Sequence, residues 1–141
     1  MSKLLHYALV PLILRLVLGG VFIGHGLQKI PNASSWASQN PKAPEAVREL
    51  PSIVQVLVAF GEFLGGIALV IGILTRFAAF GLAAIMTGAI FLVHLPNGFS
   101  NSQGGFEYPL VLGVISLAVV LTGSGAFGFD HWFKFRNKDK N

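Results

Sequence analysis

Four ionisable side chains interrupt long apolar stretches of this sequence. They are Arg15, His25, Glu62 and His94, and the residues around each are mostly aliphatic, aromatic or glycine. If these stretches cross a bilayer, each ionisable group costs several kcal/mol unless it is paired, hydrated or able to reach the interface. We therefore expect these four residues to have partners, and we expect the chemistry of the chain to involve them.

The position of Glu62 predicts an ion pair inside the protein. At 1.5 Å rise per residue, Arg15 lies roughly 9 Å and Glu62 roughly 18 Å from the same expected side of the membrane. An extended arginine can close most of this difference, so we predict a buried ion pair between Arg15 and Glu62, with His25 as the alternative partner. The pair either only fixes the register of two helices or serves proton or ligand chemistry, and the sequence leaves both alternatives open.

Several further polar residues lie where the first stretch ends and around the loop that follows the third stretch. At the end of the first stretch, His25, Gln28 and Lys29 have i, i+3, i+4 spacing and therefore share one helix face. His94 and Glu107 lie on either side of the loop that follows the third stretch. We expect these side chains to rim one outward-facing pocket. The predicted ligand-binding candidates, with the glutamate of the second stretch included, are His25, Gln28, Lys29, Glu62, His94, Glu107 and Tyr108.

The two histidines, His25 and His94, leave three alternatives open. They are axial haem ligands or part of a metal site, they only make hydrogen bonds to backbone and water, or they bind the head group of a quinone or another small molecule. Neither histidine belongs to a metal-binding spacing such as H-E-x-x-H. The sequence therefore disfavours haem and metal, predicts no metal site, and assigns no catalytic residue.

Transmembrane helices are the elements that must position these side chains. The chain has 141 residues, of which 53% are hydrophobic and 11% charged, and its mean hydropathy is +0.68; an average soluble domain is roughly a quarter charged. Apolar stretches of about the 20 residues that a helical span needs cover residues 7–30, 53–74, 77–95 and 108–127. We predict an all-α integral membrane four-helix bundle, formed by residues 1–141 as a single transmembrane domain with a tail at 129–141.

The distribution of Lys and Arg predicts that both termini face the cytoplasm. Basic residues outside the spans are more frequent on the side that carries the termini, with Lys3, Arg76, Lys134, Arg136, Lys138 and Lys140, than on the other, with Lys29, Lys42 and Arg48. The pI of about 9.8 then reflects membrane topology and not a nucleic-acid surface. We expect the lipid bilayer as the surroundings of the chain and no nucleic-acid partner.

Three segments of the sequence resemble signatures of the DoxX family. They are residues 15–29 (RLVLGGVFIGHGLQK), 62–76 (EFLGGIALVIGILTR) and 122–130 (TGSGAFGFD). The resemblance extends over nearly the whole chain and implies a small, multi-pass, four-helix protein of the bacterial inner (plasma) membrane. Members are often labelled oxidoreductases or subunits of quinol or thiosulfate oxidation, so the resemblance also implies redox partners. The residues at its motif positions are Arg15, His25, Gln28, Lys29, Glu62 and Arg76.

Together, these features favour a redox-associated membrane subunit that binds a quinone-like or other small hydrophobic ligand in the outward-facing pocket. The first alternative is a non-catalytic assembly or partner subunit. The second is a small transporter or proton pathway through Glu62 and His25, which would require several copies of the chain. The sequence contains no cysteine, so electron transfer would need a bound cofactor, such as a quinone, or a partner protein. If the chain is an enzyme, it is an oxidoreductase subunit of this kind, whose expected partners are redox proteins and further copies of itself.

The predicted orientation can be tested by labelling single cysteines in intact cells. Because the two longer loops are expected to face outward, cysteines at Ser34 and Ser100 should react with a membrane-impermeant maleimide, while a cysteine at Asn141 should react only after lysis. Labelling at Asn141 before lysis would reverse the orientation.

Overall fold

The computed structural model describes residues 2–136, and the side chains of residues 7–133, as a set of helices without a strand. The basic residues Lys138 and Lys140, and Asn141, lie outside the described residues. The α-helices within these residues are α1 (Ser2–Lys29), α2 (Glu45–Arg48), α3 (Ser52–Ile71), α4 (Thr75–Ala89), α5 (Glu107–Thr122) and α6 (Phe129–Arg136). Short helices are η1 (Ile30–Asn32), η3 (Leu95–Asn97) and η4 (Asn101–Gln103), together with the π-helical turn η2 (Ile90–His94) that continues α4.

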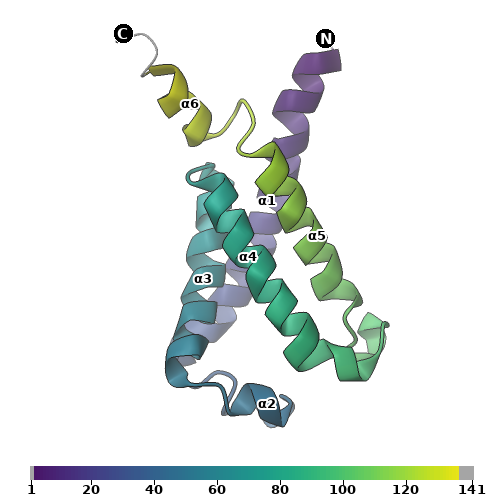
Figure 1. Cartoon of the computed structure of the whole chain (residues 1–141). Coiled ribbons are helices and arrows are strands. Elements are labelled where there is room, and N and C mark those ends of the chain that lie inside the picture. Colours follow the sequence, from purple (N-terminus) through teal and green to yellow (C-terminus); the bar gives the residue numbers. More distant parts are fainter. Residues whose placement is uncertain (1, 137–141) are drawn as a thin grey trace.

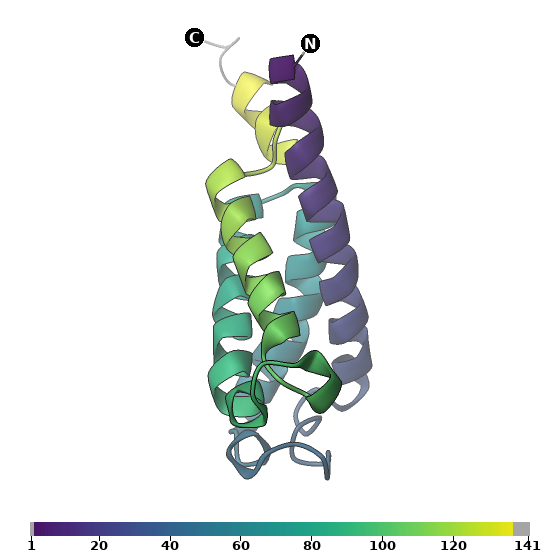
Figure 2. The ribbon, with the colours of Figure 1, turned by 90° about the vertical axis from the view of Figure 1, so that its right-hand side faces the viewer.

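The four long helices form an antiparallel bundle, in which α1 packs mainly along α3, and α4 packs along α5 and α3. Figure 1 shows that the start of α1, the turn between α3 and α4, and α6 lie at one end of the bundle, which we call the terminal end. The segment that carries α2 and the segment that carries η2, η3 and η4 lie at the other, which we call the loop end, as the rotated view in Figure 2 also shows. The predicted all-α helical bundle is confirmed.

In the described part of the chain, three helical stretches are long and apolar enough to cross a membrane, namely Tyr7–Asn32, Ser52–Ile71 and Thr75–Asn97. α5 is apolar but has 16 residues, a rise of about 24 Å against a hydrocarbon core of about 30 Å. It ends at Thr122 and not near residue 127, because Gly123 follows with a φ of +72° and ends the helical conformation. Large apolar side chains cover much of the outer surface of the bundle, as expected for a protein in a lipid bilayer.

Glycines set the distance between α1 and α3. A Cβ atom at Gly19 would lie 2.7 Å from the backbone oxygen of Gly66, and a Cβ atom at Gly26 would lie 2.6 Å from the backbone nitrogen of Phe63. Only residues without a side chain permit such an approach, which is a common way for helices to pack in membranes. The two contacts also fix the antiparallel register, because they place residue 19 beside residue 66 and residue 26 beside residue 63.

Arg15 lies at the terminal end, where it binds the last backbone carbonyls of α3. Its side chain is 1% exposed; Nε donates to the oxygen of Leu69 at 2.9 Å, one Nη donates to that of Val70 at 3.3 Å, and the other donates to that of Ser124. These carbonyls have no partner inside the helix, and their partial negative charge favours a cation there. Arg15 therefore caps the carboxyl end of α3.

The predicted ion pair between Arg15 and Glu62 is wrong, and so is the alternative with His25. The contact between Gly19 and Gly66 places Arg15 at the level of Leu69 and Val70. Glu62 lies seven residues before Leu69 on α3, a rise of about 11 Å, so the two charges are two helical turns apart. Glu62 instead pairs with Lys29.

Asp130 stabilises the same turn between α3 and α4 at the point where α4 begins. Its two carboxylate oxygens accept hydrogen bonds from the backbone nitrogens of Leu74, at 2.8 Å, and Thr75, at 2.9 Å. These nitrogens begin α4, where a negative charge is favourable. A positive side chain thus caps the helix that ends at this turn, and a negative one caps the helix that begins there.

Removing the Arg15 cap should destabilise the bundle independently of Glu62. Because a hydrogen bond to a charged group is worth about 1.5–3 kcal/mol and Arg15 makes three of them, Arg15→Met should lower the free energy of unfolding in detergent by about 5 kcal/mol. The loss in the double variant with Glu62→Gln should equal the sum of the single losses within about 0.5 kcal/mol. Arg48→Met, at an exposed residue of α2, is the control. A double variant that is more stable than the sum predicts would place Arg15 and Glu62 in one network.

Candidate ligand-binding site

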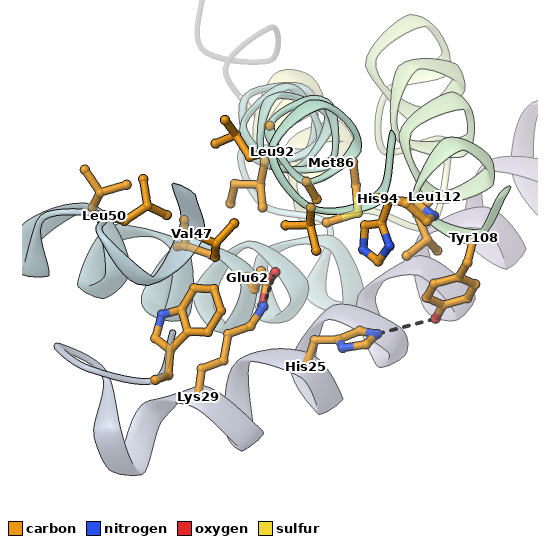
Figure 3. A pocket seen from close by; sticks show the side chains of 18 residues that line it. His25, Lys29, Val47, Leu50, Glu62, Met86, Leu92, His94, Tyr108 and Leu112 are labelled. Carbon is orange, nitrogen blue, oxygen red and sulfur yellow. Dashed lines mark hydrogen bonds and ion pairs between the residues drawn. The ribbon is translucent and has the colours of Figure 1, made fainter. Parts of the chain in front are cut away.

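A cavity of about 320 Å³ lies at the loop end of the bundle, between the long helices and the segment that carries α2. Most of its lining is aliphatic. Figure 3 shows that polar side chains from several elements point into it: from α1, α3, η2 and α5, these are His25, Lys29, Glu62, His94 and Tyr108. An apolar cavity with a few converging polar groups is the usual form of a small-molecule site.

The Lys29 and Glu62 side chains form an ion pair in the cavity wall. Nζ of Lys29 lies 2.6 Å from Oε1 and 2.5 Å from Oε2 of Glu62. The Glu62 side chain is only 3% exposed and that of Lys29 is 20% exposed. The close approach of α1 to α3 at Gly26 lets Lys29, at the last residue of α1, extend its side chain back to the carboxylate. In this pair the Glu62 side chain is therefore buried, whereas the Lys29 side chain remains partly accessible.

Lys29 also contacts an aromatic ring that lines the cavity at the loop end. Its Nζ lies 4.8 Å from the ring centroid of Trp36, a distance typical of a cation–π interaction. Trp36 belongs to the segment between α1 and α3, and its indole nitrogen donates to the backbone oxygen of Gln55 at 2.9 Å. The indole ring thus covers the ion pair at the loop end.

Gln55, on the first turn of α3, fastens this segment to the bundle. It is fully buried. Its Nε2 donates to Ser38 Oγ at 2.8 Å and to the oxygen of Leu50 at 2.9 Å, and its Oε1 accepts from the nitrogen of Ala37 at 2.9 Å. The sequence analysis did not include Gln55 among the site residues, although an uncharged amide near the start of an apolar stretch is a signal for such a role.

His94 is held in a defined orientation at the end of the π-helical turn η2. Its Nδ1 lies 2.7 Å from the backbone oxygen of Gly104. A carbonyl oxygen only accepts hydrogen bonds, so Nδ1 carries a proton, and in the neutral ring Nε2 is then an acceptor. π-helical turns occur frequently at functional sites. His94 therefore offers the cavity an imidazole nitrogen that can accept a hydrogen bond.

His25 and Tyr108 form the third polar group, on the side of the cavity made by α1 and α5. Nε2 of His25 lies 3.5 Å from the Tyr108 hydroxyl, at the limit for a hydrogen bond, and the ring centroids are 6.0 Å apart. The contact is long enough that either side chain could turn toward a bound molecule.

Two of the predicted candidates do not line the cavity. Gln28 is exposed on α1. Glu107 is exposed at the first residue of α5, and its Oε2 accepts a hydrogen bond from the backbone nitrogen of Asn101 at 3.1 Å. His25, Lys29 and His94 line the same cavity, whereas Glu107 stabilises the loop before its own helix.

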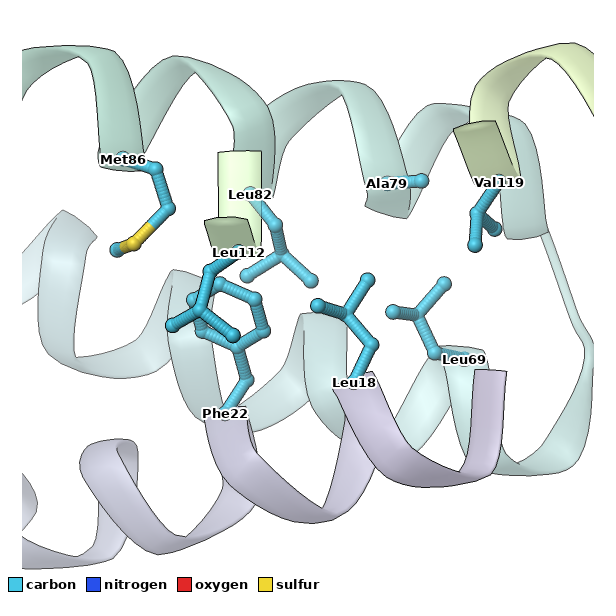
Figure 4. Packing of buried hydrophobic residues seen from close by; sticks show 8 residues of the cluster. All are labelled: Leu18, Phe22, Leu69, Ala79, Leu82, Met86, Leu112 and Val119. Carbon is cyan, nitrogen blue, oxygen red and sulfur yellow. The ribbon is translucent and has the colours of Figure 1, made fainter. Parts of the chain in front are cut away.

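The apolar core of the bundle separates the cavity from the Arg15 cap. Figure 4 shows the packing of this core, whose buried residues are Leu18, Phe22, Leu69, Ala79, Leu82, Met86, Leu112 and Val119. Met86 and Leu112 also form the inner wall of the cavity. On α1, Leu18 and Phe22 lie between Arg15 and His25 and are fully buried. Among the described residues, no three His, Asp or Glu side chains gather in a group that could hold a metal ion.

Comparison with known proteins relates the chain to a family of membrane proteins. The family model described as DoxX matches residues 10–95, a segment that contains the ion pair and His94 but not Tyr108. The protein named "Putative oxidoreductase CatD" of Bacillus subtilis is 30% identical over 127 residues, which are 90% of this chain and 88% of that protein. Two proteins of Haemophilus influenzae with the name "Uncharacterized protein" are each 29% identical over 124 residues; the alignments cover 87% and 85% of this chain, and 82% and 87% of those proteins. No solved structure matches the chain.

The coupling between Lys29 and Glu62 should be measurable by thermal unfolding in detergent. Lys29→Met leaves a buried carboxylate without a partner and should cost roughly 3 kcal/mol. Glu62→Gln should cost less, because the freed lysine can move its ammonium group toward the interface. The double variant should recover part of the loss, with a coupling energy of about 1 kcal/mol or more. Lys42→Met, at an exposed lysine of the same loop end, is the control. Additive losses would show that the pair contributes nothing to the fold.

Proposed function

The chain belongs to the DoxX family of membrane proteins, and on this premise we propose that its cavity binds the head group of a quinone-like or other small hydrophobic molecule. In this proposal the protein is a redox-associated membrane subunit. The observation that supports it most strongly is the meeting of five polar side chains from α1, α3, η2 and α5 at one cavity with aliphatic walls.

The size and lining of the cavity suit a single aromatic ring. A volume of about 320 Å³ is near the lower end of the range for small-molecule sites. Aliphatic side chains such as Val58 and Leu112 would contact the faces of the ring. The polar groups lie at the wall, where they would meet its substituents. The cavity therefore favours a compact head group with polar atoms at its edge.

The hydrogen-bonding groups suit both oxidation states of a quinone. Quinone oxygens accept hydrogen bonds, and Lys29 has one ammonium proton beyond the two that face Glu62. Quinol hydroxyls donate hydrogen bonds, and Nε2 of His94 can accept one because Nδ1 is committed to Gly104. Tyr108 can do either. A site of this kind would hold the ligand before and after electron transfer.

Electron transfer itself would involve groups that the chain does not carry. The sequence has no cysteine, so electrons would pass between the bound molecule and a partner redox protein. The similar Bacillus subtilis protein has a name that refers to an oxidoreductase, and this agrees with a redox role. We place the protein in the bacterial inner membrane, with four crossings and both termini in the cytoplasm, so that the cavity opens on the outer side.

Quinone binding can be followed by the fluorescence of Trp36, because quinones quench indole fluorescence and Trp36 lines the cavity. Trp36 and Trp132 are the two tryptophans of the chain, so Trp132→Phe makes Trp36 the single reporter. A short-chain benzoquinone should quench this variant saturably. Adding His94→Leu should weaken binding about fivefold, since one net hydrogen bond is worth about 1 kcal/mol.

The control is the reciprocal variant, Trp36→Phe, in which Trp132 reports from α6 at the terminal end. Its quenching should increase in proportion to the quinone concentration without saturation. If both reporters behave alike, and extracts of the protein purified in mild detergent contain no quinone, the chain acts in another way, for which a non-catalytic partner subunit is the alternative.

A further inference from the structure

The cavity reaches the outer surface of the bundle between α3 and α4, beside Gly88. Along the middle of their length, α3 and α4 are in contact. A Cβ atom at Gly65 would lie 3.2 Å from Leu82, and one at Gly61 would lie 3.2 Å from Ile85. One turn farther toward the loop end, the same register brings Gly88 opposite Val58. A Cβ atom at Gly88 has no described atom within 4 Å, although Gly88 lines the cavity. The helices therefore separate here, and the gap between them is continuous with the cavity; α2, which contacts η2, borders the gap on the loop-end side.

The rim of this opening is apolar. Val54 and Val58 border it on α3, Gly88 borders it on α4, and Leu92 borders it on η2. Leu92 lines the cavity and is also 44% exposed, so it lies at the boundary between the cavity and the outside. Figure 3 shows Leu92 on the far side of the cavity from His25 and Tyr108. On a membrane protein, an apolar rim of this kind opens into the hydrocarbon of the bilayer and not into water.

Beside the Lys29 and Glu62 pair, hydrogen bonds hold the segment with Trp36 over the cavity at the loop end. Trp36 covers the Lys29 and Glu62 pair, and the segment that carries it is fastened by the four hydrogen bonds that involve Gln55. A molecule that entered past Trp36 would have to break several of these bonds. A molecule that came between α3 and α4 would break none of them.

Building on the ligand site proposed above, we propose that the ligand is dissolved in the bilayer and carries an apolar chain. Its head group enters the cavity between α3 and α4, and its chain remains in the opening, along Gly88. The absence of a side chain at Gly88 provides the space for this chain. The ligand class is thus an amphiphile with a small polar ring and an isoprenoid or alkyl tail, and free water-soluble quinones or phenols are excluded as the preferred ligands.

Substitutions at Gly88 test this inference, and Gly81 offers a matched control. Gly81 lies on the same helix, a Cβ atom there also has no described atom within 4 Å, and Gly81 does not line the cavity. Both positions are helical, and replacing glycine by leucine or alanine improves helix propensity. Gly88→Ala, Gly88→Leu and Gly81→Leu should therefore all fold. In each variant, carrying Trp132→Phe, the quenching of Trp36 is titrated with two probes: a benzoquinone with a decyl chain and the same ring without it.

The measured quantity is the ratio of the affinities of the two probes. The wild-type protein should prefer the decyl probe, and Gly88→Leu should reduce this preference about tenfold, as expected if about two methylene groups lose their contacts. Gly88→Ala should reduce it less, and Gly81→Leu should leave it unchanged. A ratio that Gly88→Leu does not change, whether both probes still bind or both bind more weakly, would overturn the route between α3 and α4. Failure of both probes to bind the wild-type protein would instead contradict the proposed function itself.

Discussion

The close contact between α1 and α3 is the constraint on which the rest of the structure depends. Gly19, Gly26 and Gly66 bring the two helix backbones together, and this contact decides which charged side chains meet. Lys29 reaches Glu62 at the loop end, and Arg15 reaches the carbonyls of Leu69 and Val70 at the terminal end. A shift of α1 by one helical turn, about 5.4 Å, would leave both Glu62 and Arg15 without their partners in an apolar bundle. The desolvation cost of such groups makes this register far more stable than its neighbours.

The charged residues of the bundle consequently divide into two groups with different roles. Arg15 and Asp130 bind backbone atoms and close the turn between α3 and α4, so their role is structural. Lys29 and Glu62 lie in the wall of a cavity together with His25, His94 and Tyr108, where a ligand can reach them. Leu18 and Phe22, fully buried between the two groups on α1, keep them apart. The role that we propose therefore depends on the loop end, while the terminal end holds the helices in place.

The sequence was sufficient to predict the helices, and it identified most of the polar residues that line the cavity, because apolar length and helical spacing determine both. It was not sufficient to predict the partner of Glu62. Spacing along one helix gives the depth of a residue, whereas pairing depends on the register between two helices, which the glycine contacts set. Arg15 was misassigned for a further reason: its partners are backbone carbonyls, which leave no trace in the sequence. The prediction that Glu107 lines the pocket failed for the same reason, because its partner is the backbone nitrogen of Asn101.

Photoaffinity labelling tests the central claim, that the cavity is a ligand site, most directly. The purified protein would be irradiated with a tailed azidoquinone in the presence and absence of an excess of the unmodified quinone, and the adducts would be mapped by mass spectrometry. We predict saturable adducts, suppressed by the competitor, on cavity residues of α3 and η2, such as Val58 and Leu92. Adducts that increase without saturation and spread over exposed residues outside the cavity, such as Phe77 and Phe80, would contradict the claim.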